Sequence, residues 1–316
     1  MVPLPNIPDA GATNNFQQNI GYHQVANQFD AKFDQALGAR DHFAYRFSWQ
    51  QINTLQQPSF GLAGGPENFE GTGAENVFNT AGEYTHVLSP SFLTEVRVGV
   101  DHDSNYTYPS DYGSDASSQL GIPGVNVSPF TSGLTTISIS DYSSPLVGCS
   151  PYEPWIRSET NIDVVNNWTK IAGNHSLKFG FEMRGNRQDL VQSTADSPRG
   201  TFDYGTGQTS LNASGVSAGY ANAFASFLLD VPSSVSRQDN IGDSSWREQL
   251  YYAFAQDTWQ ISHKLTLIYG MRMGVIPAAT PKKAGGFSQY NPTNNSLEVA
   301  GWKHPFQPGC WCPCRF

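Results

Sequence analysis

Apolar and polar residues alternate along several long stretches of the chain. The clearest example is residues 265–273, where Ile268 is the single exception. Side chains two positions apart in a strand point to the same face, so this pattern predicts a strand with one apolar and one polar face. The apolar positions are Leu265, Leu267, Tyr269, Met271 and Met273. The preceding run, Tyr251 to Ala255, is apolar throughout, so the pattern does not assign its faces.

A strand, a short polar break and a second strand recur along the chain. The breaks lie at residues 38–41, 89–91, 172–175 and 262–264. After the first break, the alternate apolar positions are Phe43, Tyr45, Phe47 and Trp49. The four breaks predict four hairpins with tight turns.

Long connections separate these hairpins, at residues 53–75 and 103–158. A loop as long as the second is uncommon in a compact soluble domain. Short turns at one end and long loops at the other are typical of an outer-membrane β-barrel, with periplasmic turns and extracellular loops. Trp168 and Trp259 lie near short turns, where an interfacial aromatic girdle is expected, although core packing explains either residue equally well.

Further patterns, some clear and some weak, complete the prediction of secondary structure. Strands are expected at residues 77–88, 92–101, 162–171, 177–184, 200–204 and 233–238. Residues 221–231 are interpreted as a short helix or a buried turn, and the tail from residue 277 as loop.

In the middle of the predicted strands, one face carries ionisable side chains and the other carries apolar ones. A wet lumen tolerates ionisable side chains, whereas Arg or Lys on a lipid face costs about 2–4 kcal/mol at the midplane. The candidate lumen-facing residues are Arg46, Arg97, Lys178, Glu182 and Arg184. The candidate lipid-facing residues are Phe43, Tyr45, Phe47, Trp49, Leu265, Leu267, Tyr269 and Met271. A soluble sandwich also alternates, but usually with shorter strands of about 5–6 residues.

These patterns predict an all-β protein: an antiparallel transmembrane β-barrel, partial, of about eight to ten strands from a larger barrel. The net charge of −9 argues against a nucleic-acid partner, because phosphate binding requires clustered Lys and Arg. No run of 18 apolar residues is present, and the first residues have neither the basic region nor the apolar core of a signal peptide.

No motif for catalysis or metal binding accompanies the strands. The chain lacks GxSxG, HExxH and a P-loop, so an enzyme is not expected, and no cofactor is implied. Cys310, Cys312 and Cys314 lie close together but have no partner with zinc-finger spacing, so we expect no metal site. Tyr106, Tyr108, Tyr112 and Tyr142 are predicted in a loop, either solvated or stacked on a sugar or siderophore.

Several stretches, taken in order, resemble the Oar-like family of TonB-dependent outer-membrane transporters. The resemblance covers roughly residues 3–300, and its order is more specific than any one piece. The stretches are PLPNIPDAGATNNF, NQFDAKFDQALGARDHFAYRFSW, EYTHVLSPSFLTEVRVGV, NHSLKFGFEMR, ANAFASFLLDVPSS and YYAFAQDTWQISHKLTLIYGMRM.

This resemblance implies a large barrel whose lumen is closed by a separate plug. It also implies uptake of a scarce or bulky solute, such as a siderophore or an oligosaccharide, driven by the TonB complex through that plug. The resemblance further implies that the barrel is surrounded by outer-membrane lipid. The chain departs from the family in lacking the plug and in its last residues, GCWCPCRF. We therefore expect an internal fragment of the barrel that does not transport by itself.

The resulting domain prediction has three parts. Residues 1–22 are a connector, residues 23–300 the partial barrel, and residues 301–316 a tail outside the family. Two alternatives stay open. One is a secreted β-rich binding or adhesion protein that uses residues 103–158 for recognition, and the other is a passive porin.

Overall fold

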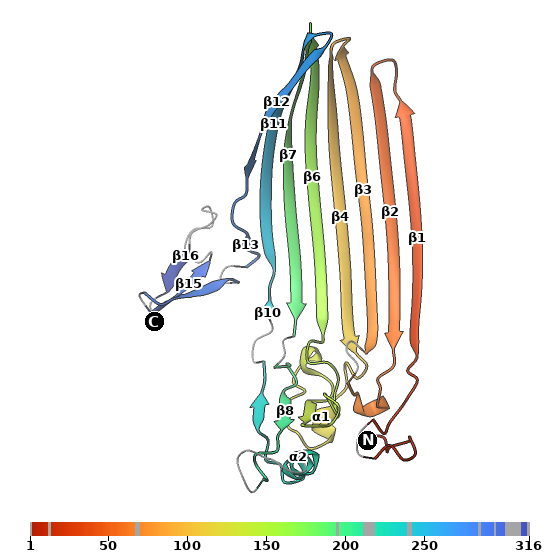
Figure 1. Ribbon diagram of the computed structural model, residues 1–316, viewed down its shortest axis with the longest axis vertical. Coiled ribbons are helices and arrows are strands. Elements are labelled where there is room, and N and C mark those ends of the chain that lie inside the picture. The colour runs from red at the N-terminus through yellow and green to blue at the C-terminus, as the bar shows by residue number, and fades with distance from the viewer. Residues whose placement is uncertain are drawn as a thin grey trace.

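A single antiparallel sheet of long strands dominates the molecule (Figure 1). The computed structural model describes residues 2–11, 14–66, 70–193, 196–210, 219–238, 242–283, 286–293, 295–300 and 311–314. Eight long strands lie in the order β1-β2-β3-β4-β6-β7-β11-β12. They are β1 (Tyr22–Ala36), β2 (Asp41–Gln56), β3 (Gly71–Ser89), β4 (Phe92–Pro109), β6 (Trp155–Ala172), β7 (His175–Gln192), β11 (Trp246–Ser262) and β12 (Leu265–Val275).

All four predicted hairpins are confirmed, and their turns lie together at one end of the sheet (Figure 1). The turns join β1 to β2, β3 to β4, β6 to β7 and β11 to β12. Gly173, in the third turn, has a φ of 59°, a left-handed conformation that costs little for a residue without Cβ. The strands are longer than sequence alternation indicated, at 15 to 19 residues for most of them.

Strand register assigns every long strand to the same pair of faces. Directly paired residues in an antiparallel sheet point to the same side. The row through Arg97 runs Ala44, Glu83, Arg97, Val165, Glu182 and Tyr252. The adjacent row runs Phe43, Tyr84, Val96, Asn166 and Phe181, on the other side. We call the side of Arg97 the polar face and the side of Phe43 the apolar face.

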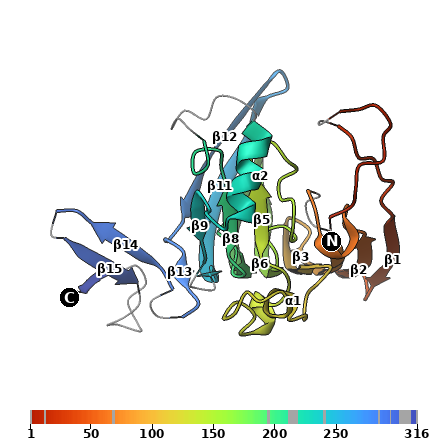
Figure 2. The same ribbon diagram turned by 90° about the horizontal axis from the view of Figure 1, so that it is seen from below.

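A second, smaller body of structure lies at the end opposite the short turns (Figures 1 and 2). We call it the loop module. Its elements are η1 (Gly61–Ala63), α1 (Ala116–Gln119), η2 (Pro129–Thr131), β5 (Thr136–Ile139), β8 (Thr201–Tyr204), α2 (Gly219–Leu228) and β9 (Ser234–Ser236). Strands β5, β8 and β9 form a three-stranded sheet. Its apolar core is Leu134, Ile139, Leu146, Val147, Tyr204 and Ala223.

Several predicted connections were wrong in extent. β2 continues to Gln56 and β3 begins at Gly71, inside the predicted loop 53–75. β4 continues to Pro109 and β6 begins at Trp155, so the predicted loop 103–158 shrinks to 110–154. That loop contains α1, η2 and β5, so it is a folded part of the module. The cause is that strand ends beyond the apolar band carry polar residues on both faces, which removes the alternation.

Of the two alternatives for residues 221–231, a short helix or a buried turn, the structure has the helix α2, and the predicted strands near 200–204 and 233–238 are confirmed as β8 and β9. The tail from residue 277 was predicted as loop but contains short strands. These are β13 (Thr280–Pro281), β14 (Ser288–Asn291), β15 (Ser296–Ala300) and β16 (Trp311–Cys314), and β10 (Gly242–Asp243) precedes β11. No helix in the described ranges is long and apolar enough to cross a membrane.

Candidate functional site

The apolar face is covered with large, solvent-accessible hydrophobic side chains across nearly all the long strands. Val98 and Phe181, in central strands, are each 45% exposed, and Met271 in β12 is 76% exposed. Soluble proteins rarely expose apolar patches beyond a few hundred Å². All eight predicted lipid-facing residues lie on this face by register: Phe43, Tyr45, Phe47, Trp49, Leu265, Leu267, Tyr269 and Met271. A face of this kind needs an apolar environment.

The polar face carries a network of ion pairs in the middle of the same strands. Arg97 Nε lies 3.0 Å from Glu83 and its Nη2 lies 2.7 Å from Glu95. Arg184 lies 2.7 Å from Asp163 and 3.2 Å from Glu182.

The five predicted lumen-facing residues share this polar face by register: Arg46, Arg97, Lys178, Glu182 and Arg184. Arg46 lies 3.8 Å from Asp30 in the neighbouring strand. Arg272 lies 3.5 Å from Glu182 and its guanidinium sits over the Tyr252 ring at 5.2 Å. The structure thus brings the five predicted residues onto one surface, although they come from three strands, β2, β4 and β7.

Register also settles the apolar run at Tyr251 to Ala255, which the pattern left open. Tyr251 pairs with Met183 and Val275, so Tyr251, Ala253 and Ala255 belong to the apolar face. Tyr252 pairs with Glu182, so Tyr252 and Phe254 lie on the polar face.

Aromatic side chains gather on the apolar face near the short turns. Trp168 stacks on Phe179 at 5.4 Å, and Trp259 stacks on His175 at 5.2 Å. Both Trp residues therefore contact neighbours across the strands, where a girdle was expected. Asp257 is buried here, and it accepts a hydrogen bond from Tyr269 Oη at 2.8 Å and lies 2.6 Å from His175 Nδ1.

A similar trio occurs on the same face, in β2 and β3. Asp41 accepts a hydrogen bond from Tyr84 Oη at 2.5 Å and lies 2.6 Å from His86 Nδ1. Alternation missed Asp257 because it is a single polar residue among apolar ones, and it missed Asp41 because that residue lies in a predicted turn. Acidic residues on a lipid-facing side need such partners, since an unpaired charge there is costly.

The four tyrosines predicted in a loop have different positions. Tyr106 and Tyr108 belong to β4, which corrects the prediction, and Tyr142 lies 5.8 Å from Phe224 of α2. Tyr108 stacks between Tyr106 at 4.7 Å and Tyr112 at 4.2 Å. Their rings contact one another or the module, which limits the ring surface available to a solute.

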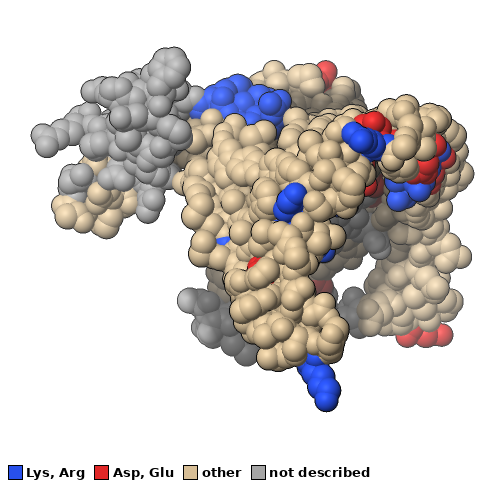
Figure 3. All heavy atoms as spheres, turned by 90° about the horizontal axis from the view of Figure 1, so that it is seen from above, with Lys and Arg blue, Asp and Glu red and all other residues tan. Residues whose placement is uncertain are grey.

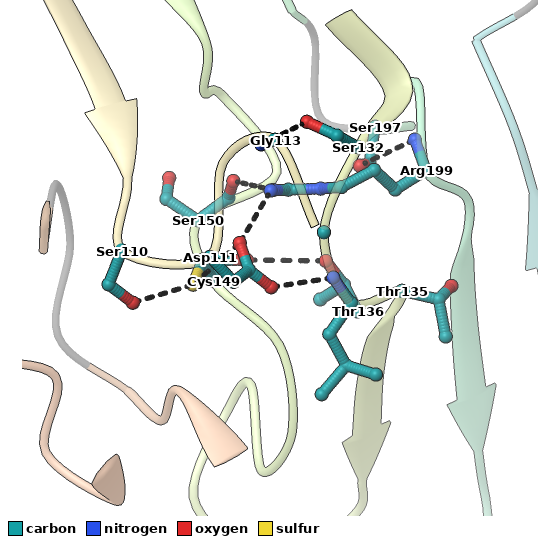
Figure 4. Close-up of polar contacts among 12 residues, drawn as sticks. Ser110, Asp111, Gly113, Ser132, Thr135, Thr136, Cys149, Ser150, Ser197 and Arg199 are labelled. Atoms are coloured by element: carbon teal, nitrogen blue, oxygen red, sulfur yellow. Dashed lines mark hydrogen bonds and ion pairs between the residues drawn. The ribbon is translucent and has the colours of Figure 1, made fainter. Parts of the chain in front are cut away.

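A buried polar centre joins the loop module to the ends of the long strands (Figure 4). Arg199 is fully buried and donates from Nη2 to the Ser150 carbonyl at 2.7 Å, and its Nη1 lies 3.7 Å from Asp111 Oδ1. Asp111 Oδ2 accepts a hydrogen bond from the Leu134 amide at 2.6 Å. The contacts join three connections that are far apart in sequence, after β4, before β6 and after β7.

Close packing around Asp111 explains one glycine. Gly133 has a φ of 97°, and a Cβ there would lie 2.5 Å from Asp111 Oδ1. Cys149 Sγ lies 3.6 Å from the same oxygen, and it lies 3.6 Å from Ser110 Oγ. Burial raises the pKa of the Cys149 thiol well above its usual range, so this thiol is not a nucleophile at neutral pH.

Two fully buried glutamates, Glu70 and Glu153, complete the centre. Neither has a hydrogen-bond partner for either carboxyl oxygen among the described residues. Burial raises the pKa of Glu70 to about 7, and the Cys149 thiol and the Arg199 guanidinium only partly oppose this shift. Burial and the neighbouring Glu70 carboxylate raise the pKa of Glu153 to about 8, which Arg199 only partly opposes. The sequence did not predict this centre, because its residues are spread between positions 70 and 199 and form no recognisable motif.

A polar cleft of about 390 Å³ lies between the N-terminal segment and the module. Its lining includes Asn14, Asn15, Gln17 and Gln18, together with Ser59. Amides donate and accept hydrogen bonds, so the cleft suits a hydroxyl-rich or amide-rich solute.

Neither the cleft nor the buried centre resembles a catalytic or metal centre. Within the described ranges, no three His, Cys, Asp or Glu side chains are placed to hold a metal ion. The predicted absence of a metal at the Cys-rich end stays a prediction, because Cys310 and the side chains of Cys312 and Cys314 lie outside the described part.

Comparison with known proteins agrees with the two-faced sheet. A family model described as an outer membrane beta barrel domain matches residues 1–310. The match takes in part of the predicted tail, and the domain limits at residues 22 and 300 stay predictions. No curated protein and no solved structure matches the chain. The match locates the protein in the outer membrane, which disfavours the alternative of a secreted protein. The chain belongs to the family of outer membrane beta barrel domains.

Proposed function

We propose that this chain forms part of the wall of a TonB-dependent outer-membrane transporter for a scarce or bulky solute. The observation that supports it best is the sheet with two opposite faces, one apolar and accessible, the other lined with ion pairs such as Arg184–Asp163. In a membrane, the first face contacts lipid and the second lines a polar lumen. The role is non-enzymatic.

The loop module supports transport of a selected solute. Residues 110–154, together with β8, α2 and β9, fold over the ends of the strands instead of extending into solvent (Figure 1). A folded module at the extracellular mouth restricts free passage, and its amide-lined cleft offers a first contact for a siderophore or an oligosaccharide. The ordered resemblance of six segments to TonB-dependent transporters is the basis for naming the energy source.

Both outer strands bear on how the wall is completed. β1 and β12 each pair on one side only among the described residues. Lipid does not tolerate unpaired strand edges. We therefore propose that further strands pair with β1 and β12. We also propose that a plug, as the resemblance implies, makes the contact with the TonB complex.

Energy dependence separates this proposal from a passive porin, with which the family is equally compatible. Cells with and without the gene are compared for transfer of a radiolabelled ferric siderophore or a linear oligosaccharide into the periplasm. We expect transfer to require the gene and to fall to the level of the deletion strain when the TonB complex is removed. Transfer that needs the gene but not the TonB complex would establish a porin instead.

A further inference from the structure

A patch of basic side chains lies on the apolar face, beyond the end of its hydrophobic positions. Along β7 this face carries Phe181 and Met183, then Gly185, and then Arg187. Arg187 pairs directly with Arg247 of β11, so both side chains project from the apolar face at the same height along the strands. Lys282 follows β13, which pairs with β11. We call Arg187, Arg247 and Lys282 the basic patch.

The height of this patch matches the outer boundary of a bilayer. Arg187 lies twelve residues beyond His175, where β7 leaves the short turn. At a rise of about 3.4 Å per residue, this distance is about 41 Å along the strand. A strand tilt of about 40° reduces it to about 31 Å along the membrane normal, whereas the apolar band of a barrel is about 25 Å tall. The basic patch therefore lies at headgroup level on the lipid-facing side.

Charge within the patch is unbalanced. Asp189 Oδ1 lies 2.7 Å from Arg247 Nη2, and its Oδ2 lies 2.7 Å from Lys282 Nζ. Both carboxylate oxygens are thus engaged, and Arg187 forms no ion pair with a described residue. Three cations meet one carboxylate, and two arginines stand directly opposite each other, which is unfavourable unless an anion lies between them.

The neighbouring strand β6 adds hydrogen-bond donors to the patch. On the same face of β6, Thr160 pairs with Arg187 and Ser158 pairs with Asp189. Glu248, the nearest acid along β11, points to the polar face, where it accepts from Asn186 at 3.1 Å. Viewed from the short-turn end, Figure 3 shows one large continuous area of Lys and Arg at the outer rim of the molecule, besides smaller and separate ones.

We propose that the basic patch binds the phosphate of an outer-leaflet lipid headgroup. Charge complementarity and continuity with the apolar face select this occupant, because a lipid that covers Phe181 and Met183 places its headgroup beside Arg187. Asp189 positions Arg247 and Lys282 for this contact. The inference rests on the lipid-facing role of the apolar face.

The test uses the full chain purified from outer membranes in mild detergent. Binding of bisphosphorylated lipid A is compared with binding of the same lipid after enzymatic removal of its phosphates. The variants are Arg187→Gln and Arg187→Gln/Arg247→Gln. The control is Lys178→Gln/Lys264→Gln. It removes one cation from the polar face of β7 and one from the short turn between β11 and β12. Heat-modifiable mobility on gels checks that each variant is folded.

Each lost cation is expected to weaken binding of the phosphorylated lipid about fivefold, and the double variant more than tenfold. The dephosphorylated lipid should bind equally weakly to all variants, and the control should bind as the wild type does. Equal binding of the phosphorylated lipid by wild type and the folded Arg187→Gln variant would overturn the proposal. Displacement of the lipid by an equal concentration of inorganic phosphate would also overturn it, since the site would then take free phosphate.

Failure of this inference is distinguishable from failure of the wall function. If the basic patch does not bind lipid, charge placed on the apolar face at Val164 still destabilises a genuine lipid-facing wall, whereas it is tolerated if the face does not contact lipid.

Discussion

Val164 and Val165 are neighbours in β6 with identical side chains, but they contact different surroundings. Val164 pairs with Val98 and Met183 on the apolar face. Val165 pairs with Arg97 and Glu182 on the polar face. Residue type alone does not distinguish the two positions, whereas strand parity does, because successive side chains of a strand point to opposite sides.

We therefore predict opposite effects of the same substitution at these two sites. Val164→Arg should lower the free energy of unfolding in lipid vesicles by about 2 kcal/mol, since it places a guanidinium in the hydrocarbon. Val165→Arg should change it by less than about 1 kcal/mol, because Glu182 and the polar face accept the charge. Urea-induced unfolding, followed by tryptophan fluorescence, measures both. Equal destabilisation by the two variants would contradict the assignment of faces.

At the scale of elements, the loop module depends on the buried centre of Asp111, Arg199, Glu70 and Glu153. Burial raises the pKa of both glutamates, to about 7 and about 8, above the ordinary value of 4.5. At pH values between 4.5 and these raised pKa values, both glutamates are ionised in the unfolded chain but protonated in the folded module. Rising pH therefore favours unfolding of the module over this window, and the effect levels off below about pH 4.5 and above about pH 8.

The module is thus expected to be more stable at pH 5 than at pH 8, by a few kcal/mol. Limited proteolysis of the loop 110–154 in intact outer membranes, at steps between these pH values, measures the difference. Glu153→Gln should reduce the pH dependence, because an amide does not titrate and only Glu70 then contributes. Glu75→Gln, on the polar face of β3, serves as the control and should leave the profile unchanged. A profile that is flat in the wild type would show that the glutamates do not control the module.

At the scale of the whole molecule, the sheet is open in the described residues. Its inner strands pair on both sides, whereas β1 and β12 have one neighbour each. All residues of β1 and β12 are correspondingly exposed. In an antiparallel edge strand, alternate amide groups have no partner, and such groups exchange hydrogen with water readily.

This arrangement predicts a distinct pattern of amide hydrogen exchange. In the isolated chain in detergent, alternate amides of β1 and β12 should exchange much faster than those of β4 and β6. In native outer membranes the same amides should become protected, because further strands of the wall pair with them. Exchange followed by mass spectrometry with electron-transfer fragmentation resolves the two strands. Fast exchange of β1 in the native membrane would contradict completion of the wall by additional strands.

The amino-acid sequence by itself determined the long strands, the four short turns and the two faces, because alternation is a local property that each strand carries alone. The alternate residues from Phe43 to Trp49 and from Leu265 to Met271 lie on one face by register, and their contact with lipid stays a prediction. Only the tertiary structure decided the faces of Tyr251 to Ala255, since an apolar run has no parity without its partners Glu182 and Met183. Only the tertiary structure revealed the buried centre around Arg199 and the basic patch at Arg187. Both bring together side chains that are distant in the sequence and share no regular spacing.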